Sequence, residues 1–188
     1  MIRESDNSES ESHQWTAIFL RDQFQKESDR AAVILTASLL DEALTSLIRS
    51  FLVPCSSAKD TIFEEVNSPL ANFSSKIDMA NRLGLISNKL TRDIHLIRKI
   101  RNSFAHDVFG CDFENGSVKG RVLELKKSMM YANHTLKSEE MALLYPGTRG
   151  EFLLCTFFIL WHLNNLIEDN THLKEAKEED FLYKILDK

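Results

Sequence analysis

Apolar residues recur along most of this chain at the three- and four-residue spacing of an α-helix. Between Asp29 and Leu52 the pattern is regular, with successive steps of 4, 3, 4, 3 and 4 residues at Val33, Ala37, Leu40, Leu44, Leu47 and Phe51. This spacing predicts one continuous helix with a single apolar stripe. Ser28 offers an N-cap before it, and Pro54 ends it.

The same periodicity predicts helices over most of the remaining sequence, and no long segment alternates with the period of two that strands require. Residues 108–117 are expected to form a loop. The expected helices are His13–Lys26, Lys59–Glu65 (short), Phe73–Leu83, Ser87–His106, Val118–Met130, Gly150–Glu168 and His172–Leu186. The sequence therefore predicts an all-α protein, a single helical bundle of about six or seven helices. We expect residues 13–188 to form one domain, preceded by a disordered acidic tail, Met1–Ser12.

Composition and charge restrict the function further. The formal net charge is −5 and the pI about 5.7, so global electrostatics do not attract nucleic acid. The chain has three widely spaced cysteines and no CxxC pair: Cys55, Cys111 and Cys155. This arrangement indicates neither a zinc site nor a disulfide framework. It is consistent with a reducing cytoplasm. The apolar run Phe152–Trp161 is too short to span a bilayer, so we expect a core helix and no membrane partner. No phosphate- or dinucleotide-binding motif is present, so no cofactor is expected.

Three strings carry a resemblance to a known family. They are ESDRAAVILTASLLDEAL (Glu27–Leu44), SPLANFSSKIDMANRLGLIS (Ser68–Ser87) and DIHLIRKIRNSFAH (Asp93–His106). In this order, over roughly the middle half of the chain, they resemble the mannitol operon repressor family. The resemblance implies an all-helical intracellular regulator of transcription, and it brings neither a catalytic set nor an established DNA-reading helix. We therefore expect action mainly through contacts with a protein partner, and a homodimer.

A second resemblance lies inside the third string. Arg101-Asn102-Ser103-Phe104-Ala105-His106 matches the Arg-x4-His signature of HEPN helical domains, many of which are ribonucleases. Metal-independent RNA cleavage needs a base near the 2′-hydroxyl and a cation on the phosphate, and His106 and Arg101 are residues of those types. Asn102 is the third candidate, because it lies four residues before His106 and so on the same helix face.

The geometry of this motif leaves two interpretations open. Five residues along an ideal helix separate Arg101 and His106 by about 140°, so a working site needs fraying at the helix end or a second subunit. Arg101 also follows Ile97 by four residues, in line with the apolar stripe. The alternative is thus structural: a buried Arg101 paired with a carboxylate, and a His106 stabilised by the helix dipole. Whether the protein is an enzyme is left open.

A third reading is direct DNA binding. The segment 76–95 contains Ala80, Gly84 and an apolar anchor at the spacing of a helix-turn-helix. Its second helix would present five side chains to the bases: Asn88, Lys89, Thr91, Arg92 and His95. The cluster of Arg98, Lys99 and Arg101 would contact phosphates. The alternative is an ordinary helical hairpin with a glycine C-cap.

Three charged residues of the first long helix are expected to form ion pairs. Asp41 falls on a mostly buried face, so it needs a partner, for which Arg101, Arg30 and His106 are candidates. Asp29 and Arg30 lie in the first turn, where they can exchange ion pairs. No carboxylate has the spacing with a histidine that a metal site requires.

Overall fold

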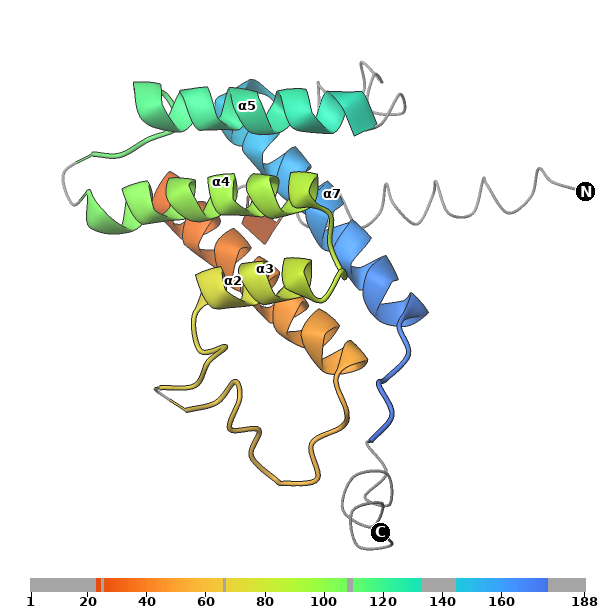
Figure 1. Cartoon of the computed structure of the whole chain (residues 1–188). Coiled ribbons are helices and arrows are strands. Elements are labelled where there is room, and N and C mark those ends of the chain that lie inside the picture. Colours follow the sequence, from red (N-terminus) through yellow and green to blue (C-terminus); the bar gives the residue numbers. More distant parts are fainter. Residues whose placement is uncertain (1–22, 25, 66, 108–109, 133–144, 176–188) are drawn as a thin grey trace, which may run out of the picture.

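The computed structural model describes residues 23–24, 26–65, 67–107, 110–132 and 145–175 of the 188-residue chain. These contain five long helices and no strand: α2 (Asp29–Phe51), α3 (Phe73–Arg82), α4 (Asn88–His106), α5 (Gly116–Ala132) and α7 (Gly147–Asp169). In Figure 1, α3, α4 and α5 lie one beside the next, while α2 and α7 run diagonally behind them. The all-α prediction is confirmed.

The helices begin at side-chain caps that the sequence provides. Ser28 Oγ accepts a hydrogen bond from the Ala31 amide at 3.2 Å, and Ser87 Oγ accepts one from the Leu90 amide at 3.2 Å. Each cap satisfies an amide that has no partner within its helix, which typically stabilises a helix by about 1 kcal/mol. Gly84 follows α3 with φ of 76°, a left-handed conformation that glycine adopts without steric cost.

One hydrophobic core joins all five helices. The fully buried side chains come from the stripe of α2, from one face each of α3, α4 and α5, and from α7. Two helices lie at the centre of the described fold: α2, which packs against α3, α4 and α7, and α4, which packs against α2, α3 and α5. The largest of these side chains are Phe104, Phe152, Leu40, Leu44, Leu47, Ile48, Ile77, Ile94, Ile97, Ile100, Leu125 and Ile159.

The expected apolar helix at Phe152–Trp161 forms part of α7. Phe152, Cys155 and Ile159 are buried in the main core. By length and composition alone, α2 and α7 could each cross a membrane, but a mostly buried core helix passes the same test. Their packing against each other within the core accounts for their apolar character.

Two expected helices differ from the structure. Residues 59–65 form turns, because Asp60 Oδ1 accepts from the Ile62 amide and Ser68 Oγ caps the Glu65 amide, which gives the backbone local alternatives to a helix. Residues 172–175 have no regular secondary structure, and the Leu173 amide donates to Phe51 O at 2.8 Å. The tail at 1–12, most of the helix expected at 13–26 and the rest of the helix expected after residue 175 lie outside the described residues.

Candidate functional site

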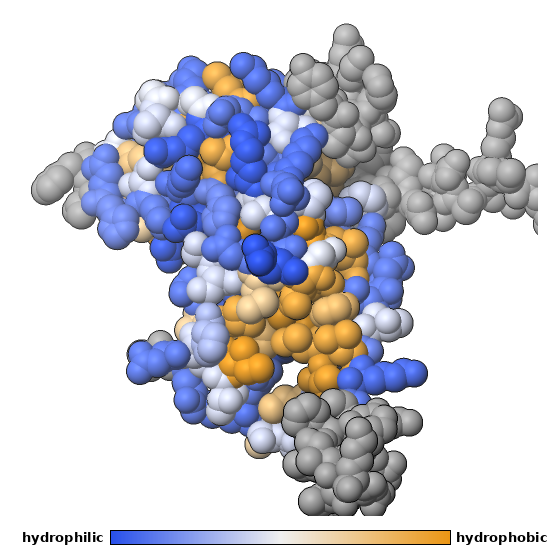
Figure 2. All heavy atoms as spheres, viewed as in Figure 1, coloured by the Kyte–Doolittle hydropathy of each residue, from blue (hydrophilic) through white to orange (hydrophobic). Residues whose placement is uncertain are grey.

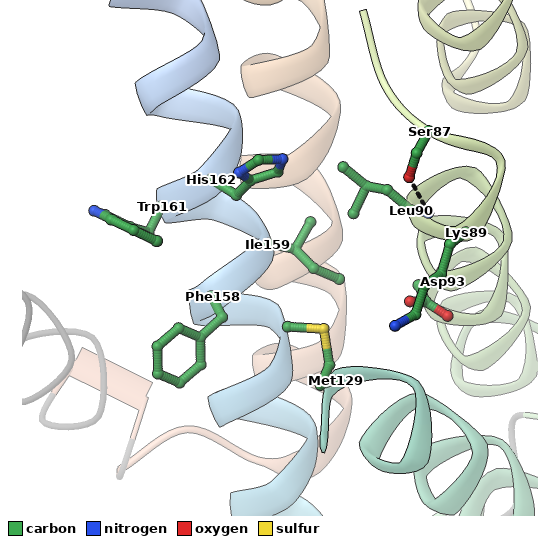
Figure 3. A pocket seen from close by; sticks show the side chains of 9 residues that line it. All are labelled: Ser87, Lys89, Leu90, Asp93, Met129, Phe158, Ile159, Trp161 and His162. Atoms are coloured by element: carbon green, nitrogen blue, oxygen red, sulfur yellow. Dashed lines mark hydrogen bonds between the residues drawn. The ribbon is translucent and has the colours of Figure 1, made fainter. Parts of the chain in front are cut away.

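A cleft opens where the first turn of α4, the end of α5 and the middle of α7 meet. Its volume is about 310 Å³, which lies at the lower end of the range for ligand pockets. Figure 3 shows Lys89, Leu90 and Asp93 on the α4 wall, opposite Ile159 and His162 on α7. The complete lining is Ser87, Lys89, Leu90, Asp93, Met129, Phe158, Ile159, Trp161 and His162.

The rim of this cleft has the composition of a protein-binding surface. Three of its side chains are partly buried and line the cleft: the thioether of Met129 and the aromatic rings of Phe158 and Trp161. In Figure 3, Phe158 and Trp161 project from the side of α7 that faces away from α4, so they widen the apolar surface beyond the cleft. The Phe158 ring packs edge-on against the buried Phe157, with centroids 5.1 Å apart. Aromatic residues and methionine are enriched at protein interfaces.

Apolar surface continues away from the cleft. Figure 2 shows hydrophobic residues gathered below the α4 level, over α3 and the C-terminal half of α7. Partly buried apolar side chains in this region include Leu83 and Leu85, which follow α3, and Leu166 and Ile167 of α7. A contiguous exposed apolar patch on a folded protein typically marks a surface that another molecule covers.

Asp93 is the one carboxylate that lines the cleft. Its side chain is only 2% exposed, and Ser128 Oγ donates to its Oδ2 at 2.5 Å. Oδ1 is buried without a hydrogen bond from the described residues. Burial raises the pKa of Asp93 above its ordinary value, and the Ser128 hydroxyl, Arg92 and Lys89 oppose that shift only in part. A carboxylate held in this way costs folding free energy, which is typical of functional positions.

Cys155 lies near the same region but is chemically inert. Burial, with Glu151 and Asp93 nearby, raises the pKa of its thiol to about 12, so the reactive thiolate is not formed near neutral pH.

The Arg101–His106 motif lies at the far end of α4, away from the cleft. Both side chains are exposed, and Arg101 Nη1 donates to Asn102 Oδ1 at 3.2 Å. The structural alternative, in which Arg101 is buried, is wrong, because the apolar stripe passes from Ile97 through Ile100 to Phe104 and leaves the exposed Arg101 at its edge. Whether these residues are catalytic stays a prediction.

The segment proposed as a helix-turn-helix is a helical hairpin. In Figure 1, α3 and α4 run in nearly opposite directions, joined by the turn at Gly84. The exposed Arg92 pairs with Glu124 of α5 at 3.2 Å, and Asn88 Oδ1 accepts from Asn81 Nδ2 at 3.1 Å. Thr91 and His95 also bond within the protein, Thr91 Oγ1 to Ser87 O at 2.9 Å and His95 Nε2 to Asp78 Oδ1 at 3.0 Å. Four of the five expected base-reading side chains are thus engaged, and the fifth, Lys89, lines the cleft.

The expected phosphate contacts occupy different surroundings. Lys99 is exposed, whereas Arg98 is only partly so, and its Nε is buried without a hydrogen bond from the described residues.

Asp41 and Arg30 of α2 have partners that the sequence did not predict. Asp41 Oδ2 accepts from Lys76 Nζ of α3 at 2.9 Å, so Arg101, Arg30 and His106 are not its partners. Arg30 instead donates to the Asp107 carbonyl oxygen at the end of α4.

Asp29 forms the ion pair expected of it, with Arg149 of α7 at 2.9 Å. Arg149 also donates to the carbonyl oxygens of Phe24, at 2.6 Å, and Glu27, at 2.8 Å. Through these hydrogen bonds, the guanidinium of Arg149 connects the first turn of α7 to the segment that precedes α2.

Comparisons with known proteins bear on the fold. No protein-family model matches the sequence, and no curated protein matches it significantly. Among solved structures, the X-ray structure of the MtlR–HPr complex from Escherichia coli superposes with a TM-score of 0.55. The match covers 79% of this chain and 98% of that chain, at 17% sequence identity. The chain has a fold similar to that of MtlR. At this level of identity the likeness to MtlR concerns the fold alone.

Sequence reasoning missed the cleft as a site. Asp93 carried a usable signal, since it follows Leu90 by three residues and precedes Ile97 by four, on the apolar stripe of α4. A carboxylate in such a position is costly and calls for an explanation. The contributions of Met129 and Trp161 depend on the approach of α5 to α7, which no local pattern predicts.

Proposed function

We propose that this chain is an intracellular regulator that acts by binding another protein through the cleft between α4, α5 and α7. The observation that carries the proposal is the cleft itself, where Leu90, Met129 and Ile159 lie around a buried carboxylate. Phe158 and Trp161 extend its apolar surface along α7. The fold similarity to MtlR, which is solved in complex with HPr, supports a protein as the ligand. The three family-like sequence strings support the same reading.

The finer proposal is that the partner is an HPr-like protein and that the regulated genes serve mannitol uptake. It rests on the resemblance to the mannitol operon repressor family and on the complex that MtlR forms with HPr. A homodimer is part of the same proposal, and light scattering on the purified protein measures it directly.

Isothermal titration calorimetry with purified HPr tests the proposal. Trp161→Ala and Met129→Ala should each weaken binding by about ten-fold or more, because truncating an aromatic or methionine side chain in an interface removes a large contact. Leu39→Ala is the matched control, since Leu39 is an apolar side chain 41% exposed on α2, outside the cleft lining.

Circular dichroism confirms that each variant is folded. Equal affinities for wild type, Trp161→Ala and Leu39→Ala would place binding elsewhere, and an absence of binding by the wild type would exclude HPr as the partner.

A second candidate function is metal-independent RNA cleavage. The exposure of both Arg101 and His106 supports it, because a catalytic pair must reach the substrate. His106 would take the proton of the 2′-hydroxyl, whose oxygen attacks the phosphate and breaks its bond to the 5′-oxygen. The 5′-oxygen takes a proton from solvent and leaves as a hydroxyl, and the other product is a cyclic phosphate. Arg101→Ala and His106→Ala should each abolish cleavage that resists chelators. An inactive wild type on single-stranded RNA would end this candidate.

Direct DNA binding is the third candidate and the least supported. The net charge of −5 opposes it, and Arg92 is paired with Glu124. Gel retardation of a mannitol operon operator at nanomolar protein, lost on Arg92→Ala, would be needed to establish it.

A further inference from the structure

Asp93 Oδ1 is an acceptor that the described residues leave unused. The other oxygen of the carboxylate takes the Ser128 hydroxyl. Arg92 Nη1 stands 3.9 Å from Oδ1, beyond hydrogen-bond distance, and the Arg92 side chain is 54% exposed and paired with Glu124. A buried acceptor without a donor costs folding free energy, so a ligand that supplies a donor here recovers that cost on binding.

The surroundings of Asp93 define which donor fits. Leu90, Met129 and Ile159 make the neighbouring walls apolar, while the opening admits solvent and the exposed Lys89 and His162 lie at its edge. A guanidinium matches these walls, because it is planar and more weakly hydrated than an ammonium group and so tolerates apolar contact on its faces. Its N–H groups make charge-assisted hydrogen bonds to carboxylates, which are about twice as strong as neutral ones.

We infer that the cleft receives an arginine side chain of the partner protein, with the guanidinium donating to Asp93 Oδ1. The source of the arginine rests on the proposed function, but the receptor site belongs to this chain alone. Ser128 is a positioning residue here, since its bond to Oδ2 fixes the carboxylate with Oδ1 left for the ligand.

A small-molecule probe tests the receptor site without any partner protein. N-acetyl-arginine amide is titrated into the ¹⁵N-labelled full-length protein and followed by NMR. N-acetyl-citrulline amide is the matched control, because it has nearly the same shape without the charge. The arginine derivative should shift the amide signals of residues lining the cleft, and citrulline should not. Equal binding of both, or no binding of either, would overturn the inference.

Two variants make the assignment specific. Asp93→Asn keeps an acceptor for Ser128 but removes the charge, and should weaken the arginine derivative by about ten-fold. Lys89→Met removes a cation that faces the same carboxylate, and should strengthen binding of the arginine derivative. An Asp93→Asn protein that is folded and binds the arginine derivative as wild type does would show that Asp93 is not the receptor.

Parallel titrations with HPr separate this inference from the proposed function. If the arginine derivative binds in an Asp93-dependent way but HPr does not bind, the proposed partner is wrong while the arginine site stands. If HPr binds wild type and Asp93→Asn equally and the arginine derivative does not bind, docking stands and the arginine site is wrong.

Discussion

Replacing Lys76 with methionine should destabilise the fold more than the loss of an ordinary surface lysine. The Lys76 side chain is 9% exposed, and its ammonium donates to Asp41 Oδ2 at 2.9 Å between α3 and α2. Asp41 Oδ1 is already buried without a hydrogen bond from the described residues. Methionine keeps much of the volume of the lysine stem, so the substitution isolates the loss of the charge.

The magnitude follows from the burial of the two partners. Breaking a fully buried ion pair costs roughly 3–5 kcal/mol, whereas a surface pair is worth at most about 1 kcal/mol. Asp41 is 33% exposed, so water still reaches the stranded carboxylate. We therefore expect a loss of about 2 kcal/mol in the free energy of unfolding, or roughly 4–8 °C in melting temperature for a chain of this length.

Urea denaturation followed by circular dichroism measures this loss. Asp41→Leu should cost a similar amount by stranding the Lys76 ammonium. The double variant, Asp41→Leu with Lys76→Met, should recover most of the stability, because neither charge is then left without a partner. The reasoning fails if either single variant changes stability by less than about 0.5 kcal/mol, or if the two losses simply add.

Three further predictions concern other parts of the molecule. Gly150→Ala should lower the free energy of unfolding by several kcal/mol in chemical denaturation, because the added Cβ would overlap the Tyr145 carbonyl group. Gly120→Ala is the control: Gly120 lies within α5 and an added Cβ meets nothing within 4 Å, so this variant should be neutral or stabilising. Asp93→Asn should raise the melting temperature at pH 7. Burial raises the pKa of Asp93 in the folded protein above its ordinary value of 3.8. The wild type therefore loses stability as pH rises through that raised pKa and the carboxyl becomes charged, whereas the asparagine variant does not. The advantage of the variant over the wild type should vanish as pH falls toward 3.8. Arg101→Ala should lower stability by less than about 0.5 kcal/mol, since the side chain is exposed; a melting curve that drops by several degrees would show a buried role instead.

Helix positions and caps could be predicted because their causes are local. The stripe from Val33 to Leu47 is buried as its spacing indicated, and Ser28 and Ser87 cap α2 and α4. The error at residues 59–65 also has a local cause, because short polar side chains there bond to the backbone of a turn.

The partners of charged residues could not be predicted, because they depend on how helices pack. Asp41 needed a cation, but the sequence offered several, and only the approach of α3 to α2 selects Lys76. Arg101 appeared to lie on the buried stripe, yet at the edge of that stripe the orientation of α4 decides between core and solvent. The cleft depends in the same way on three helices that are distant in sequence.

The most direct test of the docking cleft is an NMR map of HPr binding. The ¹⁵N-labelled protein is titrated with unlabelled HPr, and the backbone amides that shift are assigned. The account predicts that the largest shifts fall on residues 87–93 of α4, around Met129 of α5 and on residues 158–162 of α7. Shifts concentrated around Arg101 and His106, with the cleft residues unmoved, would contradict it.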